Sequence, residues 1–173
     1  MSKVPAVELR PAGPADEQFL CSVYASTRAE ELAVTGWSDE QKDAFLRSQF
    51  DAQHRYYREN YRGAEFWVIR VADRDAGRLY VGRFGEEMRI IDIALLPEFR
   101  GRGVATWLIG CLIREAADLG LPLRIHVERF NPALRLYERL GFRPVADRGI
   151  YLFLERPPDG QAPTAGDETQ VGG

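Results

Sequence analysis

Two glycines alternating with two arginines, followed by an apolar run, are the first place where residue types and spacing indicate chemistry. The stretch FRGRGVATWLI covers residues 99–109. Gly101 and Gly103 would let the chain turn tightly and let an anion approach the backbone. The amides from Gly101 to Thr106 would then converge at the positive end of a helix, where backbone N–H groups bind phosphate without side chains. The stretch therefore predicts either an anion cradle or a plain strand-to-helix turn.

Three other interpretations of this stretch fail on its residues. A dinucleotide fingerprint needs G-x-G-x-x-G inside a parallel strand–helix–strand unit, and only G-R-G-V-A is present. A Walker loop needs Gly-Lys followed by Ser or Thr, which the stretch lacks. A nucleic-acid patch needs basic residues beyond the loop, and the formal net charge of the chain is −3. The cradle and the structural turn both stay open at this point.

Two elements must position the loop. The preceding run, residues 87–96, is nearly continuously apolar after Arg89, which predicts a central strand buried on both faces. Asp92 lies inside this run, where an unpaired charge would be expensive. After the loop, apolar residues recur at i, i+3, i+4 and i+7 from Val104 to Leu119, and Gly120 follows as a stop, so we expect an amphipathic helix.

The remaining elements alternate between strand and helix patterns. Hairpin-joined strands before the loop and single strands after it indicate an α/β sheet of mixed direction with helices on its faces. In NPALRLYERLGF, we expect Asn131 as N-cap, Pro132 at the first helical position and Gly141 as the stop, with Phe142 folding back onto the helix. The other expected elements are a strand over 7–10, helices beginning near 14 and 38, strands over 65–72 and 78–84 joined by a turn at 73–77, and strands over 121–127, 143–147 and 150–156.

Two of these stretches taken together resemble the GNAT superfamily of N-acetyltransferases. LLPEFRGRGVA is similar to its pyrophosphate-loop motif, Arg/Gln-x-x-Gly-x-Gly/Ala, at Arg100, Gly103 and Ala105. NPALRLYERLGF is similar to its Asn-and-Tyr motif at Asn131 and Tyr137. The resemblance favours the cradle over the plain turn.

The order of elements also agrees with this family over residues 6–156. The resemblance implies an α/β fold with a mixed, mostly antiparallel central sheet of about seven strands, flanked by about four helices and splayed at its two central strands. We expect residues 1–156 to form a single acetyltransferase domain and residues 157–173, which lack core-forming side chains, to form a disordered tail.

The resemblance implies an acyltransferase that uses acetyl-CoA as co-substrate, without a metal. It would transfer the acetyl group to a primary amine of a small molecule, by direct attack in a ternary complex. Alternatives are acetylation of protein N-termini or lysines, and a coenzyme-A-binding module without turnover. The implied coenzyme contacts are the backbone of Ile93, Ala94 and Leu95, the loop residues Arg100, Gly101, Arg102, Gly103, Val104, Ala105 and Thr106, and Asn131.

The acid and the base of such a transfer are implied with unequal clarity. Tyr137 matches the family's general acid, although its helical stripe would also suit a core residue. An amine of the lysine type has a pKa of about 10.4, so a base or an ordered water must take its proton. His126 stands where some family members carry Glu, and Asp92 is the other candidate. His126 could instead be a satisfied strand histidine, and Asp92 could pair with an arginine.

The acceptor side is expected in residues 28–62 and near the loop 147–149. Trp37, His54 and Tyr57 could wall a pocket, although the pattern favours a helix that packs its aromatic face on the sheet. The sequence does not identify the acceptor amine.

Composition bounds the class of protein. Hydrophobic residues make up 45% and charged residues 28% of 173 residues, which is ordinary for one globular domain. The acidic balance argues against nucleic acid and anionic membranes as partners. Of the 23 basic residues, 21 are arginine, so no single arginine stands out as functional. The sequence shows neither a signal peptide nor a membrane-spanning run, and we expect a cytoplasmic protein and possible homodimers. Cys21 and Cys111 are expected to be buried, inert thiols.

Overall fold

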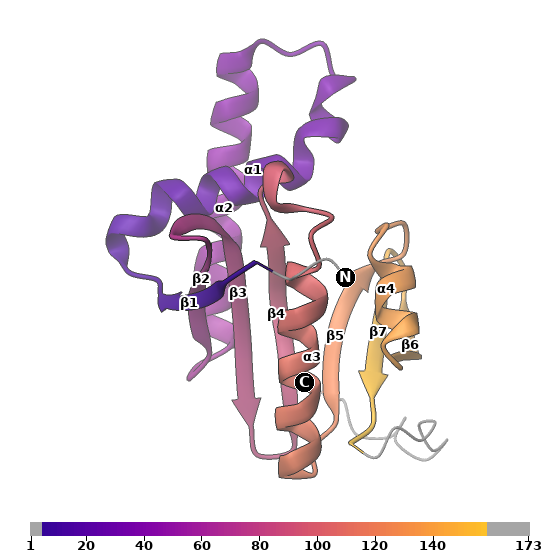
Figure 1. The fold of residues 1–173 in the computed structure, drawn as a ribbon. Coiled ribbons are helices and arrows are strands. Elements are labelled where there is room, and N and C mark those ends of the chain that lie inside the picture. Colours follow the sequence, from indigo (N-terminus) through magenta and orange to yellow (C-terminus); the bar gives the residue numbers. More distant parts are fainter. Residues whose placement is uncertain (1–4, 159–173) are drawn as a thin grey trace. The chain divides into compact units, whose positions relative to one another are not determined.

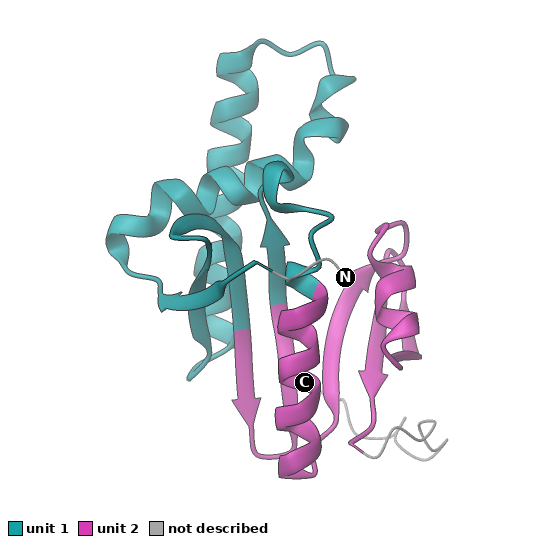
Figure 2. Ribbon diagram, in the orientation of Figure 1, with its two compact units in different colours: residues 1–80, 92–105 teal, residues 81–91, 106–173 magenta. Residues whose placement is uncertain are grey.

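The computed structural model describes residues 5–158 and divides into two compact units (Figure 2). Unit 1 comprises the described residues up to 80 together with 92–105, and unit 2 comprises 81–91 together with 106 onward. Of the segment expected to be a disordered tail, residues 159–173 lie outside the described residues.

Seven strands form one sheet in the order β1-β2-β3-β4-β5-β7-β6 (Figure 1). β4 and β5 pair in parallel, while the pairs β1–β2, β5–β7 and β6–β7 are antiparallel, so the sheet has the predicted mixed direction. The elements in chain order are β1 (Val7–Pro11), η1 (Pro14–Asp16), α1 (Glu17–Ala33), α2 (Asp39–Asn60), β2 (Glu65–Val71), β3 (Arg74–Phe84), β4 (Glu87–Leu95), η2 (Pro97–Phe99), α3 (Val104–Leu119), β5 (Leu123–Glu128), α4 (Leu134–Arg139), β6 (Arg143–Arg148) and β7 (Tyr151–Arg156).

In unit 1, α1 and α2 pack against each other. Ser38 caps α2: its Oγ accepts the N–H of Gln41 at 3.2 Å, and the Gln41 side chain accepts the N–H of Ser38 at 2.9 Å. This capping box satisfies two backbone donors that the helix start leaves without partners. The two helices bury one apolar cluster together with β2, formed by Leu20, Tyr24, Leu32, Leu46, Phe50 and Val68.

Unit 2 contains strands whose two faces differ. On β5, Leu123, Ile125 and Val127 are buried, whereas Arg124 and His126 between them are partly exposed. Because side chains alternate across a strand, the apolar residues share one face and the polar ones share the other. α3 begins and ends where its apolar period predicted, and Figure 1 shows α3 and α4 in front of the strands of this unit.

The hairpin between β2 and β3 does not turn where the sequence indicated. Its turn residues are Ala72 and Asp73, with φ of 48° and 66°, rather than the segment 73–77. A two-residue loop with both residues at positive φ has a twist that matches the flanking strands. The strand β3 therefore starts at Arg74, earlier than expected.

The expectation that β4 is buried on both faces is wrong. Residues 91–94 are only partly buried, whereas Met88 and Ile90 are fully buried. Within unit 2, the pairing of β4 with β5 runs as far as Ile90 and Ile125 and does not continue to the next pair of positions. The end of the pairing agrees with the splay expected for these two strands.

Candidate active site

The glycine loop leads directly into α3, as a cradle requires. Gly101 and Gly103 have φ of +74° and +79°, a left-handed conformation that L side chains rarely adopt. α3 starts at Val104, so the first N–H groups of this helix lack partners in a preceding turn. Among the described residues, nothing lies within 4 Å of the point where a Cβ would stand on Gly101. The loop therefore offers bare backbone donors to an anion.

The two arginines of the loop have different surroundings. Arg100 donates from Nε to the carbonyl of Leu95 at 3.0 Å and from Nη2 to Ser26 Oγ at 3.3 Å. Its side chain thus ties the loop to the end of β4. The guanidinium of Arg102 lies 5.9 Å from the ring centroid of Phe99 and is exposed.

Asp92 forms an ion pair with Arg78 of β3. The side chain of Arg78 is 3% exposed and that of Asp92 is 23% exposed. Arg78 also donates to Gln53 Oε1 at 2.9 Å, and its guanidinium carbon lies 5.1 Å from the ring centroid of Tyr80. A buried guanidinium with these partners holds the carboxylate in place. Of the two alternatives left open for Asp92, pairing with an arginine is present in the structure.

Tyr57 belongs to the same polar cluster in unit 1. Its ring meets that of Tyr80 edge-on, with centroids 5.9 Å apart. Burial, and then the nearby charge of Asp92, raise the pKa of the Tyr57 hydroxyl above its usual value. Tyr57 is therefore a neutral phenol beside the Arg78–Asp92 pair.

The two other acceptor-side candidates have aromatic neighbours within unit 1. The ring of His54 stacks on Phe50 at 5.4 Å, and burial, followed by the charge of Arg58, lowers its pKa. Both ring nitrogens of His54 are buried without a hydrogen-bond partner among the described residues. Trp37 is 40% exposed and packs edge-on against Phe45. The structure thus brings Tyr57 together with Asp92 and places Trp37 in a separate surface pair.

Tyr137 lies in unit 2 on α4 and is 4% exposed. The end of α4 is as predicted: Gly141 has φ +96°, and the N–H of Phe142 donates to the carbonyl of Tyr137 at 3.0 Å. The rings of Tyr137 and Phe142 meet edge-on at 5.5 Å. This Schellman motif fixes both the backbone and the ring of Tyr137.

Asn131 does not cap α4, which corrects the sequence prediction. The N-cap is Ala133, and the Oδ1 of Asn131 accepts the N–H of Ala133 at 2.8 Å. The carbonyl of Asn131 accepts the N–H of Leu134 at 3.0 Å. An asparagine that bonds the amide two residues on shapes a turn of its own, so it delays the start of the helix.

His126 faces cations and an aromatic ring. It stacks on Phe153 with centroids 4.5 Å apart, and its Nε2 lies 3.2 Å from Nη1 of Arg148. Burial, then Arg89 and then Arg148, lower the pKa of His126 to about 4. The imidazole is therefore neutral at pH 7 and accepts from Arg148, which makes it a weak base as it stands.

The sequence missed the two arginines that define the surroundings of the base candidates. Arg78 and Arg148 are ordinary members of a set of 21 arginines, and no spacing singles them out. On β3 the residues from Ala76 to Gly82 are all buried, so no alternation of polar and apolar residues marks Arg78.

The cysteines are less buried than expected. Cys21 and Cys111 are both free thiols with partial exposure, and burial raises the pKa of Cys21. In residues 5–158, no group of three or more His, Cys, Asp or Glu side chains is placed to hold a metal ion. No helix in the same range has both the length and the hydrophobicity of a membrane span.

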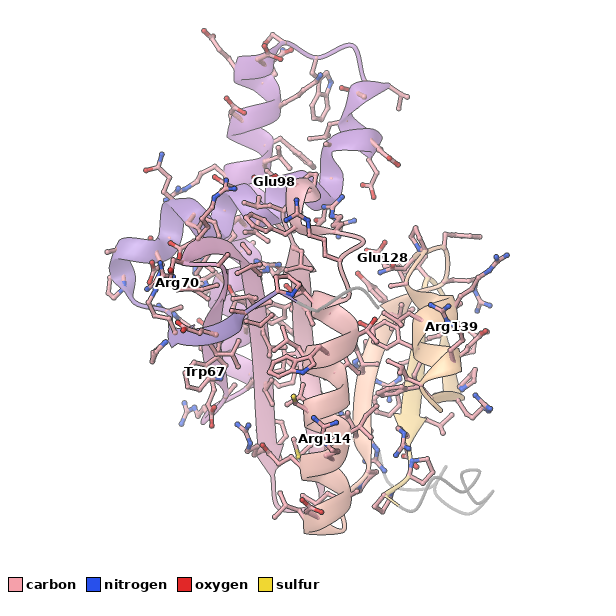
Figure 3. All side chains as sticks on the ribbon, in the orientation of Figure 1. Trp67, Arg70, Glu98, Arg114, Glu128 and Arg139 are labelled. Carbon is pink, nitrogen blue, oxygen red and sulfur yellow. The ribbon has the colours of Figure 1, made fainter. Side chains whose placement is uncertain are left out.

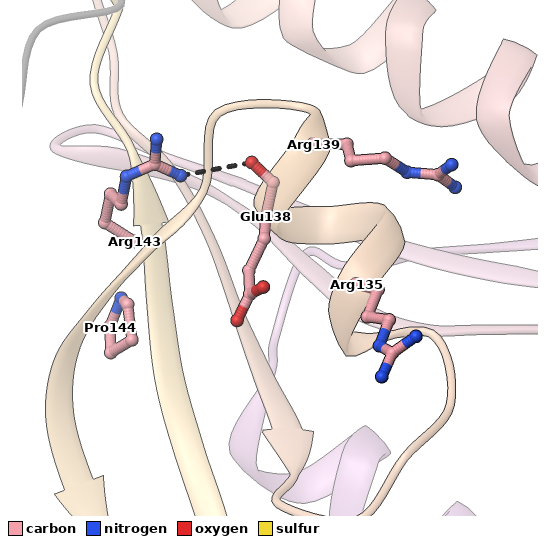
Figure 4. A pocket seen from close by; sticks show the side chains of 5 residues that line it. All are labelled: Arg135, Glu138, Arg139, Arg143 and Pro144. Atoms are coloured by element: carbon pink, nitrogen blue, oxygen red, sulfur yellow. Dashed lines mark hydrogen bonds between the residues drawn. The ribbon is translucent and has the colours of Figure 1, made fainter.

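A shallow depression lies on the outer side of α4 and β6 (Figure 4). Arg143 donates there to the carbonyl of Glu138 at 3.1 Å. The lining residues are Arg135, Glu138, Arg139, Arg143 and Pro144, and Arg139 is also labelled in Figure 3. None of the residues predicted for the site belongs to this set.

Comparison with known proteins gives a consistent family assignment. Residues 62–144 match the family described as acetyltransferase (GNAT) domain. A [ribosomal protein bS18]-alanine N-acetyltransferase of Haemophilus influenzae is 36% identical over 67 residues, which cover 38% of this chain and 46% of that protein. The match therefore spans less than half of that relative.

Solved structures share the fold over most of the chain. The PaiA N-acetyltransferase from Thermoplasma acidophilum, in complex with coenzyme A, aligns with a TM-score of 0.67 at 16% identity and covers 88% of this chain and 99% of that chain. An acetyltransferase from Thermus thermophilus aligns with a TM-score of 0.63 at 19% identity, over 89% of this chain and 98% of that one.

Proposed function

The chain belongs to the GNAT family of N-acetyltransferases, and from this membership we propose that it transfers an acetyl group from acetyl-CoA to the primary amine of a small molecule. The observation that carries the proposal is the open turn of Gly101 and Gly103 at the start of α3. Bare N–H groups at a helix N-terminus suit the pyrophosphate of a coenzyme A thioester. The same coenzyme would use the backbone of Ile93, Ala94 and Leu95 and the side chain of Asn131.

The reaction requires one new C–N bond and the loss of one C–S bond. The neutral amine attacks the thioester carbonyl, and the thiolate leaves with a proton. An N–H donor near Leu95 would stabilise the oxyanion, a contribution of several kcal/mol in comparable sites, about 3 kcal/mol per donor. Tyr137 supplies the proton to the thiolate. His126, Asp92 or an ordered water removes the proton of the ammonium.

The environments of the two base candidates favour different roles. Asp92 is held by the buried guanidinium of Arg78, which fixes the position of its carboxylate. His126 has a free-enzyme pKa of about 4 because of burial, Arg89 and Arg148. A His126 base therefore needs a change in its surroundings when the acceptor binds.

A second candidate is acetylation of a protein N-terminus. It is favoured by the relative from Haemophilus influenzae, whose name gives the alanine of a ribosomal protein as its acceptor. The exposed apolar residues near the β6–β7 turn, with Phe130 at 88% and Ile150 at 67% exposure, offer contact area for a peptide.

The test is release of free thiol from acetyl-CoA in the presence of a panel of small amines and of peptides that begin with alanine. Turnover with small amines alone supports the proposal, and turnover with peptides alone supports the second candidate. Gly103→Glu serves as the internal check, since its bulk and negative charge oppose pyrophosphate binding. Unchanged affinity of this variant for acetyl-CoA would overturn the cradle, whereas acetyl-CoA binding without turnover would indicate a silent binding module.

A further inference from the structure

One face of the strands of unit 2 carries guanidinium groups around the ring of Phe153. The guanidinium carbons of Arg89, Arg124 and Arg148 lie 5.2, 6.0 and 5.0 Å from the centroid of this ring. These distances are typical of cation–π contacts. The imidazole of His126 stacks on the same ring at 4.5 Å. We call this set of five side chains the Phe153 face.

Strand register places these residues on one side of the sheet. Arg89 pairs with Arg124, and His126 pairs with Phe153, and paired residues point to the same face. The buried apolar residues of β5 alternate with them and so point the other way. The Phe153 face is therefore opposite to the apolar face of this strand.

Two carboxylates neutralise two of the three guanidiniums. Arg124 binds Glu155 at 2.8 Å and Glu87 at 3.4 Å, and Arg89 binds Glu87 at 2.8 Å. Glu155 is 7% exposed, so its ion pair is a permanent part of the face. These contacts pair Glu87, Arg89, Arg124 and Glu155 with one another within the protein.

Arg148 of β6 has no such carboxylate. Its one polar contact within the described residues is with Nε2 of His126 at 3.2 Å, an uncharged partner. Glu128 of β5 and Arg148 of β6 both pair with Tyr151, so this carboxylate is on the same side of the sheet as His126. Of the three guanidiniums around the Phe153 ring, Arg148 is the one whose hydrogen bond goes to an uncharged side chain. The lowered pKa of His126, about 4 from burial, Arg89 and Arg148 in that order, is what an imidazole at a positive potential experiences.

We propose that Arg148, on the Phe153 face, binds an anionic group of the acceptor, a carboxylate or a phosphate carried by the same small molecule as the amine. The inference rests on the proposed function, and it narrows the acceptor from any small amine to an amine with an acidic group. A guanidinium is the side chain best suited to a carboxylate or phosphate, because it can donate two parallel hydrogen bonds. Arg148 is exposed and can reach a ligand without disturbing the core.

Binding of such an anion also changes His126. It neutralises Arg148 and withdraws the guanidinium from Nε2, which removes the part of the pKa lowering that comes from Arg148, while burial and Arg89 still hold the pKa of His126 below its ordinary value. Nε2 then accepts one proton from the substrate ammonium, which leaves a neutral amine and an imidazolium. The imidazole therefore becomes a stronger base when an acceptor of the right kind is bound.

The kinetic test uses matched acceptors that differ in the anionic group. Amino acids are compared with their amides, and phosphoethanolamine with ethanolamine, on the wild type and on Arg148→Gln. We expect kcat/KM to favour one anionic member over its neutral match by about tenfold to a hundredfold in the wild type, the usual range for a charge-assisted contact. This preference should vanish in Arg148→Gln, and comparing the ratio between the two proteins cancels the different basicities of the amines.

Arg114→Gln is the matched control, since Arg114 lies on α3, outside the Phe153 face (Figure 3). It should keep the wild-type preference. A preference for amino acids over their amides identifies the anionic group as a carboxylate, and a preference for phosphoethanolamine over ethanolamine identifies it as a phosphate. Acetylation of amines with no preference in the wild type, or with a preference that survives Arg148→Gln, overturns the inference and leaves the proposed function intact.

A second measurement does not depend on turnover. Nuclear magnetic resonance can follow the titration of His126 with free coenzyme A present, in the absence and presence of the preferred anionic acceptor. We expect the pKa of His126 to rise with that acceptor and to stay unchanged with its neutral match. If no amine is acetylated at all, the proposed function fails. The same titration with amino acids and phosphoethanolamine then tests the anion site separately. A pKa of His126 that stays constant with every anion overturns the proposed role of Arg148.

Discussion

Two pairs of side chains, one in each unit, have similar neighbours but different net charges. They are the buried pair of Arg78 and Asp92 in unit 1 and the contact of Arg148 with His126 in unit 2. Each sets a guanidinium against an aromatic ring and a titratable side chain. In unit 1 the guanidinium is buried and meets a carboxylate. In unit 2 it is exposed and meets a neutral imidazole. The first arrangement is complete within the protein, and the second lacks an anion.

This difference separates stability from chemistry. A buried ion pair resists the loss of either partner, because the remaining charge is left without compensation. An exposed guanidinium contributes little to stability and keeps its capacity to bind a ligand. Substitutions of Arg78 or Asp92 should therefore lower stability, whereas substitution of Arg148 should change ligand binding.

The largest effect is expected at Arg78. Arg78→Met leaves Asp92 facing a low-dielectric interior and should lower the free energy of unfolding by about 3 kcal/mol or more. Asp92→Asn should cost a similar amount, because it strands the guanidinium. Urea unfolding gives these values, and Arg148→Met is the counterpart that should change stability by less than about 1 kcal/mol. Equal losses at Arg78 and Arg148 would remove the distinction between the two sites.

Tyr137 sharpens the comparison, because it is about as buried as Arg78 but belongs to the proposed chemistry. Tyr137→Phe keeps the ring that packs on Phe142 and removes only the hydroxyl. Turnover should fall by about tenfold to a thousandfold, the scale of general-acid help. Coenzyme affinity, measured by calorimetry, and the melting temperature should stay close to the wild type. A loss of stability that matches the loss of rate would make Tyr137 a core residue.

His126 should make the protein sensitive to mild acid. The pKa of His126 is lowered to about 4 by burial, Arg89 and Arg148, so the unfolded chain binds a proton at higher pH than the folded one. Its contribution to stability is therefore present above about pH 6.5 and is lost as the pH falls toward 4. The free energy of unfolding, measured at several pH values across this window, should depend less on pH in His126→Gln than in the wild type. A wild-type slope retained by that variant assigns the acid sensitivity to other groups.

The smallest effect is expected from Arg148 on the free enzyme. Arg148→Gln should raise the pKa of His126 by less than about one unit, because burial and Arg89 lower it more than Arg148 does. A histidine titration by nuclear magnetic resonance measures this shift. A rise of several units would show that Arg148 dominates the environment of His126.

The parts of the fold with strong periodicity were predictable. The bounds of α3 follow from its apolar stripe and the glycine after it, and the end of α4 follows from Gly141 and Phe142. The start of α4 was not predictable, because Asn131 suits an N-cap and an isolated turn equally well. Only the bond from its Oδ1 to Ala133 distinguishes the two.

The glycine loop could be predicted, whereas the charge environment of the base candidates could not. A turn that exposes backbone amides requires glycines at particular positions, and their spacing can be recognised in the sequence. The partners of Asp92 and His126 come from β3 and β6, about 14 and 22 positions away in sequence, and depend on strand register. With 21 arginines available, the sequence does not say which two lie beside Asp92 and His126.

The shortness of α4 makes the Tyr137 hydroxyl dependent on residues that touch no substrate. A helix of six residues is far too short to persist alone in water. It is held by the turn at Gly141 and by the ring of Phe142, which is fully buried. Random mutagenesis selected for lost acetyl transfer should therefore recover changes at these two positions beside those in the glycine loop, and such changes would be mistaken for contacts with the coenzyme.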